Sequence, residues 1–374
     1  MTRGSKAVAV GLVAATAAVL TAANAPAHGK AACPKTRYRN LVLVSARTGR
    51  VDRSFPDANY PPLAMVTDGR GGWFLAMPED YCIGNVYVNG IARLRPDGRL
   101  DKSWHGRVPH VPVAGAVTEL DRVGDTLYAS GGGWVEALNA RTGARRWVFK
   151  NLKGGLGAGL VANWSVVFVG FRSGSLLEGK RHWGPVALDA RTGKVLPWHA
   201  DLPGKPRAVG PLALDGGRLF MAVNTPQAAF LAVDARTGRL TGWRAPQIGE
   251  AAGPFLVTHG LLITTNADGN AYIANAETGQ PVSGFGSQGL TGFSAIAASG
   301  NTLYAYGVGL GCARSWEVQG QTRSSVAAID LRNLKLTPWT PAARTRYTCI
   351  RGIAADRSQV LVAGPLTARG LAGQ

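Results

Sequence analysis

A short motif recurs along the chain and constrains its fold more than any other feature. Its clearest copies run from Ala137 to Trp147, from Ala187 to Trp198 and from Ala232 to Trp243. Weaker copies lie at Thr48–Phe55, Asp97–Trp104, Thr278–Phe285 and Arg332–Trp339. The motif therefore occurs seven times, at intervals of roughly 40 to 55 residues. Intervals of this length are typical of the blades of β-propellers.

The turn inside the motif has the chemistry of a tight hairpin. Its glycine is expected to take a positive φ, and in the last copy Asn333 is expected to do so. The Asp before the turn can accept hydrogen bonds from turn amides. The aromatic residue comes four to six residues after the glycine, which places it on an outer strand, between neighbouring sheets. The clearest residues of this structural repeat are Asp189, Gly193, Trp198, Asp234, Gly238, Trp243, Gly143 and Trp147.

A second, more apolar half-unit alternates with the first. Its copies begin near Leu63, Gly115, Ala158, Gly210, Gly253, Ser294 and Arg351. Their small and apolar residues suit the crowded inner strands near the axis of a ring. The chain starts with an outer half (Leu41–Phe55) and ends with an inner half (Arg351–Gly364). We therefore expect an all-β, seven-bladed β-propeller, closed by a composite blade with N-terminal outer and C-terminal inner strands.

The N-terminus indicates export. Arg3 and Lys6 precede an apolar run from Ala7 to Leu20, and Ala25-Pro26-Ala27 offers a small-residue cleavage site. Residues 1–27 are therefore predicted to be a signal peptide, cut after about Ala27, and the protein is expected to be secreted. The remaining predicted boundaries are a lead-in at 28–40, the propeller at 41–366 and a tail at 367–374. No transmembrane segment is expected.

Four cysteines, Cys33, Cys82, Cys312 and Cys349, suit two disulfides in an exported chain. All four map to one face of the propeller, in adjacent blades around the ring closure. The preferred pairs are Cys33–Cys82 and Cys312–Cys349. Cys33–Cys349 with Cys82–Cys312 is the alternative.

At Ala137–Trp147 the pattern A-x-D-x-x-T-G-x-x-x-W resembles the PQQ-like repeats of the quinoprotein alcohol dehydrogenase-like superfamily. The segment Val88–Leu94 with Asp97-Gly98 is similar to delta-60 propeller repeats. Quinoprotein dehydrogenases have eight blades, an adjacent cysteine pair and acidic calcium ligands. This chain has seven repeats and no adjacent cysteines. The resemblance therefore implies the fold but not bound PQQ, and we predict no cofactor.

The longest irregular connections share one face of such a propeller, and loops on a rigid scaffold commonly carry function. The candidate binding residues there are Arg172, Arg181, Trp183, Arg207, Arg244, Trp316, Arg346 and Tyr347. Trp183 and Trp316 are expected to act as stacking platforms for an anionic or sugar-containing ligand. The alternative interpretation is solvated loop charge, with the aromatics pinning the loops.

The formal net charge of +19 favours anionic partners. Export argues against nucleic acid among them. The favoured hypothesis is a secreted, monomeric, non-enzymatic binding or scaffold protein that engages an anionic cell-surface or wall polymer, or a protein, through the long-loop face. The alternative is an extracellular lyase, lactonase or sugar-active hydrolase with a site at the axial mouth. Its candidate residues are His110, Arg207, Glu250 and Arg351. A PQQ-dependent oxidoreductase is less favoured, and the histidine spacing predicts no metal site.

Overall fold

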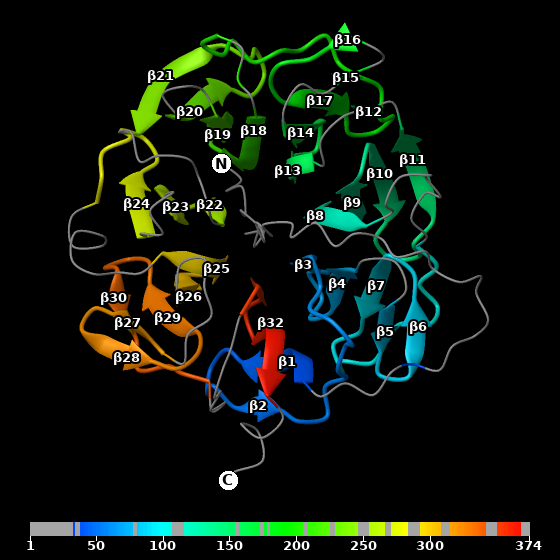
Figure 1. Cartoon of the computed structure of the whole chain (residues 1–374), viewed down its shortest axis with the longest axis vertical. Helices are drawn as coiled ribbons and strands as arrows, with labels where there is room; N and C mark the ends of the chain where they lie inside the picture. Colours follow the sequence, from blue (N-terminus) through cyan, green and yellow to red (C-terminus); the bar gives the residue numbers. More distant parts are fainter. Residues whose placement is uncertain are drawn as a thin grey trace, which may run out of the picture.

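Seven antiparallel blades stand around a common axis in the computed structural model, and Figure 1 shows them as a ring. The structure describes residues 33, 38–77, 81–106, 116–150, 152–153, 157–172, 176–177, 180–204, 206, 208–224, 229–245, 254–265, 271–282, 292–307, 315–341 and 350–367. Strands are the regular secondary structure of these residues, which confirms the all-β prediction. Within these ranges, no helix is long and apolar enough to cross a membrane.

The blades are numbered here from the one that holds the first strand, and each is given from its inner to its outer strand. Blade 1 contains β31 (Gly352–Ala355), β32 (Gln359–Thr367), β1 (Tyr38–Ser45) and β2 (Val51–Asp52). Blade 2 contains β3 (Ala64–Thr67), β4 (Trp73–Ala76) and β7 (Ile91–Leu94). Blade 3 contains β8 (Val117–Val123), β9 (Thr126–Gly131), β10 (Trp134–Asn139) and β11 (Arg145–Phe149).

The remaining four blades follow the same order. Blade 4 contains β13 (Gly157–Ala162), β14 (Val166–Arg172) and β17 (Val186–Asp189). Blade 5 contains β18 (Ala208–Asp215), β19 (Arg218–Asn224), β20 (Ala229–Asp234) and β21 (Leu240–Ala245). Blade 6 contains β22 (Phe255–Thr258), β23 (Leu261–Thr265) and β24 (Ala271–Asn275). Blade 7 contains β25 (Phe293–Ser299), β26 (Thr302–Gly307), β29 (Ala327–Asp330) and β30 (Lys335–Leu336).

The composite blade closes the ring as the sequence predicts. Strand β1 pairs antiparallel with β32, in a register that runs from Tyr38 opposite Thr367 to Ser45 opposite Gln359. Around the axis, each inner strand contacts the inner strands of both neighbouring blades, in the order β31, β3, β8, β13, β18, β22, β25 and back to β31. The two ends of the propeller therefore share one sheet, and the unpaired sheet edges that remain are those of the outermost strands of the blades.

The repeated turn has the predicted hydrogen bonds. In blade 4, the Gly193 amide donates to the Asp189 carbonyl at 2.8 Å, and the Asp189 carboxylate accepts from the Thr192 amide and hydroxyl, both at 2.7 Å. Gly193 has a φ of 72°, in the left-handed region that glycine enters without strain. Gly143 and Gly238 have φ of 77° and 76° in the equivalent turns.

The last copy of the turn differs from the prediction. The positive φ falls on Leu334, at 57°, and not on Asn333. The Asn333 side chain instead accepts from the Lys335 amide at 2.9 Å, as the Thr192 hydroxyl accepts from the Lys194 amide in blade 4. Asn333 therefore replaces the threonine of the motif, and Leu334 replaces its glycine.

Neighbouring blades meet where the turn glycine of one blade approaches the motif aromatic of the blade before it, or the backbone directly after that aromatic. A Cβ atom on Gly193 would lie 2.5 Å from the ring of Trp147, and the Trp147 indole nitrogen donates to the Ala190 carbonyl at 3.0 Å. Each motif tryptophan also meets an aromatic ring of its own blade. The pairs are Phe74–Trp104, Tyr128–Trp147, Phe168–Trp198, Phe220–Trp243 and Tyr304–Trp339. The motif thus joins one blade to the next, as predicted.

Three short inserted sheets lie at the periphery of the disc (Figure 1). Their strands are β5 (Tyr81–Ile83) and β6 (Val86–Val88), then β12 (Leu152–Lys153), β15 (Leu176–Leu177) and β16 (Lys180–Arg181), and finally β27 (Trp316–Val318) and β28 (Gln321–Arg323). The third insertion covers the outer edge of blade 7, because the Gln319 side chain accepts from the Leu336 amide at 2.8 Å and donates to the Leu334 carbonyl at 2.5 Å.

Replacing Gly193 by alanine tests the contact between blades. Gly193→Ala adds both left-handed strain and the overlap with Trp147, and should lower the free energy of unfolding by about 3 kcal/mol. Gly216→Ala is the matched control, because Gly216 has a φ of 55° and no atom within 4 Å of the added Cβ. It should cost only about 1 kcal/mol. Chemical denaturation measures both values, and equal losses would contradict the close approach of the two blades.

Candidate functional site

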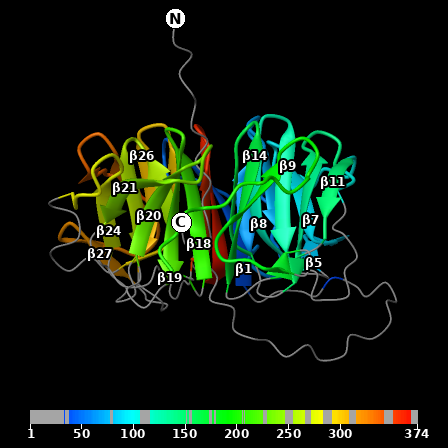
Figure 2. The same cartoon turned by 90° about the horizontal axis from the view of Figure 1, so that it is seen from above.

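Each face of the disc collects one class of connection. The turns between the first and second strands of a blade, and between its third and fourth, lie on one face, here called the hairpin-turn face. The connections between second and third strands, and between blades, lie on the opposite face, here called the long-loop face. Figure 2 shows the disc from its edge, with the strands running from one face to the other.

The hairpin-turn face carries an exposed arginine at one position of the repeated turn in five of the seven blades. These are Arg47, Arg141, Arg191, Arg236 and Arg332. Pro96 and Glu277 occupy the position in the other two blades. A second exposed cation follows the turn glycine, or Leu334, in five blades. These cations are Arg50, Arg99, Lys194, Arg239 and Lys335. The turn motif therefore repeats charge around the disc as well as backbone shape.

Some of these cations are neutralised by carboxylates and others are not. Arg141 pairs with Asp125 at 2.7 Å, and Arg332 pairs with Asp330 at 2.6 Å. The hydrogen bond from Arg332 lowers the pKa of Asp330 to about 2. Among the described residues, Arg47 and Arg191 take part in no salt bridge. Their guanidinium groups are therefore available to an anionic ligand.

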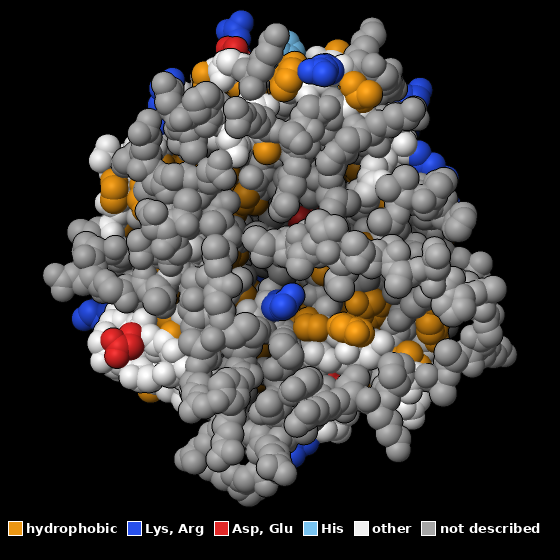
Figure 3. All heavy atoms as spheres, viewed as in Figure 1, with side chains coloured by type: hydrophobic (Ala, Val, Ile, Leu, Met, Phe, Trp, Pro, Cys, Tyr) orange, Lys and Arg blue, Asp and Glu red, His pale blue; other side chains and the backbone are white. Residues whose placement is uncertain are grey.

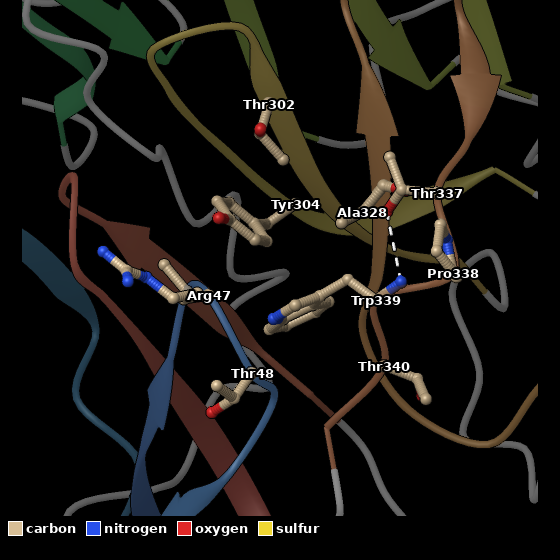
Figure 4. Close-up of a pocket in the computed structure, with 10 residues that line it drawn as sticks. Arg47, Thr48, Thr302, Tyr304, Ala328, Thr337, Pro338, Trp339 and Thr340 are labelled. Carbon is tan, nitrogen blue, oxygen red and sulfur yellow. Dashed lines mark hydrogen bonds between the residues drawn. The ribbon is translucent and has the colours of Figure 1, made fainter.

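A pocket of about 500 Å³ opens where blade 7 meets blade 1, and we call it the seam pocket. Its lining residues are Ala46, Arg47, Thr48, Thr302, Tyr304, Ala328, Thr337, Pro338, Trp339 and Thr340. In Figure 4, Arg47 lies on one side, Thr337 and Pro338 lie on the other, and the rings of Tyr304 and Trp339 stand between them. No carboxylate lines the pocket. Its side chains can therefore offer aromatic surface, hydroxyls and one positive charge.

The walls of the seam pocket are held by hydrogen bonds across the ring closure. The Trp339 indole nitrogen donates to the Ser45 carbonyl of blade 1 at 3.1 Å. The Trp339 amide donates to the Thr337 hydroxyl at 3.3 Å, and that hydroxyl donates to the Ala328 carbonyl at 3.0 Å. The rings of Tyr304 and Trp339 meet edge to face, 5.1 Å apart. These contacts fix the aromatic wall before any ligand arrives.

The sequence did not single out the residues of the seam pocket. Arg47 and Trp339 lie at opposite ends of the propeller sequence, and only the composite blade brings them together. The repeated motif could have pointed to the pocket, since Arg47 and Trp339 both occupy positions of that motif. Ring closure makes the last tryptophan and the first turn neighbours.

The long-loop face shows only part of its predicted binding site. Arg181 and Arg244 are exposed and Trp183 is half-buried, while Arg172 ends β14 and its side chain is not described. Arg207, Arg346 and Tyr347 lie outside the described residues. Figure 3 views this face and shows Lys and Arg side chains spaced around the rim, with one near the centre.

Trp316 does not fit the predicted role of a stacking platform. Its side chain is 3% exposed, and its indole nitrogen donates to the Ser325 carbonyl at 2.8 Å. Its ring packs edge to face on Tyr306, with 6.3 Å between the centroids. Trp316 therefore holds the inserted hairpin β27–β28 against blade 7, as the alternative interpretation of loop-pinning aromatics expects.

The predicted axial site is described at one residue only. Arg351 is exposed and precedes the inner strand β31, while His110, Arg207 and Glu250 lie outside the described residues. The residues present do not match a PQQ site of the quinoprotein type, because Cys82 is bonded to Cys33, 49 residues away, and not to an adjacent cysteine. Within the described ranges, no three His, Cys, Asp or Glu side chains are grouped to hold a metal ion.

The structure contains the preferred disulfide between Cys33 and Cys82, with the Cα atoms 5.8 Å apart. It ties the segment before β1 to the inserted hairpin β5–β6, next to the ring closure. Cys312 and Cys349 lie outside the described residues, so their pairing stays a prediction.

Blade 3 buries three carboxylates, Glu119, Asp121 and Glu136, and the pKa values of the last two are raised. Burial raises the pKa of Glu136 to about 7, although the Arg145 guanidinium donates to it at 3.0 Å. Burial likewise raises the pKa of Asp121 to about 6, although its side chain accepts from the Ala162 amide of blade 4 at 2.6 Å. Neither Asp121 nor Glu136 lines the seam pocket or lies on the two faces, so we assign both a structural role in blades 3 and 4.

Comparison with known proteins agrees with the fold. The model of the family described as "Outer membrane protein assembly factor BamB" matches residues 184–340. The match covers less than half of the chain, and together with the seven repeats and their closed ring it supports a β-propeller with PQQ-like repeats. No curated protein matches the chain.

Three solved structures are similar to the chain at low identity. BamB from Moraxella catarrhalis is 13% identical with a TM-score of 0.47, over 89% of this chain and 92% of that one. A chain of a mitotic checkpoint complex is 14% identical with a TM-score of 0.51, over 91% and 99%. The computationally designed Ika8 protein is 12% identical with a TM-score of 0.51, over 89% and 96%. The two structures with the higher TM-score share the fold of this chain.

The buried Glu136 predicts a pH dependence of stability. Because its folded pKa lies above the usual value, its contribution is present below about pH 4.5 and is lost as the pH rises through about 7. The loss should amount to about 3 kcal/mol. Glu136→Gln should remove this part of the pH dependence, whereas Glu277→Gln in an exposed turn should keep it. Denaturation curves at pH 4 to 8 measure the free energy of unfolding. An equal change of this free energy with pH in wild type and Glu136→Gln would contradict the role of Glu136.

Proposed function

We propose that the protein is an exported, non-enzymatic binding scaffold that attaches to an anionic cell-surface or wall polymer or to a protein partner. Export rests on the predicted signal peptide at residues 1–27. The scaffold role is supported by a ring whose ends share one sheet, because such a frame holds its surface side chains at fixed separations. The predicted monomer needs no second chain to close a sheet.

One observation carries the proposal. Five of seven equivalent turns present an exposed arginine, and the turn backbone around each is fixed by its own hydrogen bonds. A linear polyanion can meet several guanidinium groups at once, and each further contact is made at a high effective concentration. Arginine also binds carboxylate and phosphate through paired hydrogen bonds. Weak single contacts can thus add up to firm attachment.

A protein partner is the second candidate, and the family match favours it. The matching family is described as an outer membrane protein assembly factor, so a role in holding other proteins is a reasonable extension to this chain. The exposed Arg181 and Arg244 of the long-loop face would then contribute to the protein-binding surface. The long-loop face stays the predicted surface for such a partner.

Sedimentation with purified cell-wall sacculi tests the polymer-binding proposal. Mature protein should sediment with intact sacculi at ~50 mM salt and be released at ~500 mM, because salt screens contacts between exposed charges. Sacculi stripped of their anionic polymer by acid extraction are the matched control and should retain little protein. Arg181→Gln with Arg244→Gln should leave this sedimentation unchanged if the long-loop face serves a protein. Attachment by charge would be contradicted if wild type did not bind, if it bound intact and stripped sacculi equally, or if its binding were equal at low and high salt.

A further inference from the structure

We propose that the seam pocket is a binding site for an acidic sugar unit, a six-membered polyol ring that carries one negative group. The proposal rests on the proposed function and names the part of the polymer that one site would read. At about 500 Å³ the pocket lies within the range of ~300–1,000 Å³ that is usual for small-molecule sites. It can therefore hold a short oligosaccharide segment rather than a single ion.

The aromatic wall suits the face of a sugar ring. Trp339 is half-buried, so part of its indole remains accessible, while Tyr304 braces it edge to face at 5.1 Å. The bond from Trp339 to the Ser45 carbonyl keeps the indole from turning. A sugar can lay its apolar C–H face on such a surface, and a ring that is already fixed loses little entropy on binding.

Hydroxyl groups around the rings can complete the recognition of a polyol. Thr302 hydrogen-bonds the Tyr304 hydroxyl, and burial raises the pKa of Tyr304. The Thr48 hydroxyl accepts from the Arg50 amide at 3.3 Å and keeps its own proton to donate. A hydroxyl has one donor and two acceptor positions, so these groups retain hydrogen-bonding capacity for a ligand.

Arg47 selects for a negatively charged ligand. It is exposed, forms no salt bridge among the described residues, and stands beside Tyr304 and Trp339 in Figure 4. No carboxylate lines the pocket, and the nearest acidic influence on it is Asp356, whose charge helps to raise the pKa of Tyr304. A guanidinium can hold a carboxylate or phosphate through two parallel hydrogen bonds.

The other junctions between blades show why the seam is the better candidate. Between blades 2 and 3 the equivalent Arg141 is paired with Asp125, and between blades 5 and 6 the equivalent residue is Glu277. Between blades 3 and 4 the equivalent Tyr128 donates its hydroxyl to the Ala190 carbonyl at 3.3 Å, so that donor is used inside the protein. At the seam the arginine is unpaired.

Titration calorimetry with trigalacturonate tests the site, and the methyl ester of the same trisaccharide isolates the charge. Wild type should bind the acid at least tenfold more tightly than the ester. Arg47→Gln should weaken binding of the acid about tenfold and remove the preference over the ester, with an unchanged melting temperature because Arg47 is exposed. Arg191→Gln is the matched control, since Arg191 occupies the same turn position in blade 4, and it should bind like wild type.

Three outcomes would overturn the site. They are no binding of trigalacturonate by wild type, equal weakening by Arg47→Gln and Arg191→Gln, and equal binding of triglutamate, which has the charges but no sugar. The proposed function is judged separately, because sedimentation of Arg47→Gln with sacculi should persist through the remaining cations of the hairpin-turn face. Loss of wild-type sedimentation would contradict the function, whereas loss of the trisaccharide selectivity alone would contradict only the seam site.

Discussion

The backbone pairing of β1 with β32 is the interaction on which the rest of this structure depends. It joins residues from the two ends of the propeller sequence in one sheet and brings blade 7 against blade 1. Without it, each of the two terminal sheets would present an unpaired edge, which is a template for aggregation. The seam pocket exists only because of this pairing, since Arg47 comes from the first turn of the propeller and Trp339 from its last complete motif.

A single turn motif carries out several tasks in blades 3, 4 and 5, which contain its full pattern. The Asp or Asn folds the turn by accepting from its amides, the glycine allows a neighbouring blade to come close, and the tryptophan fills the space between blades. The guanidinium groups of Arg47 and Arg191, which occupy the same position of the turn motif, form no salt bridge among the described residues, so they can serve an external partner. Stability and charge are thus repeated together, which lets one sequence pattern produce both a closed ring and a cationic face.

Much of this architecture could be predicted from the sequence because it repeats. Regular intervals between motifs predicted the blades, and the order of the two half-units predicted the composite blade. Features that occur once could not be found in this way. The burial of Trp316 depends on how an inserted hairpin folds onto blade 7, and the positive φ of Leu334 contradicts the local preference of Asn333. The seam pocket required the closed ring, since no local spacing connects Arg47 with Tyr304 and Trp339.

The closure is tested most directly by comparing the thermal unfolding of two rearranged chains. In a circular permutant, a short linker joins Thr367 to Tyr38, which are already paired neighbours, and the new ends lie in the connection between Asn59 and Leu63. In a deletion, residues 38–52 are removed. Both rearranged chains are compared with a linear chain of residues 38–367, which like the permutant lacks Cys33 and its disulfide to Cys82. The account predicts that the permutant melts like this linear chain and is a monomer in size-exclusion chromatography. The linear chain without residues 38–52 is expected to melt at a much lower temperature or to associate. A monomeric deletion with an undiminished melting temperature would contradict the central claim.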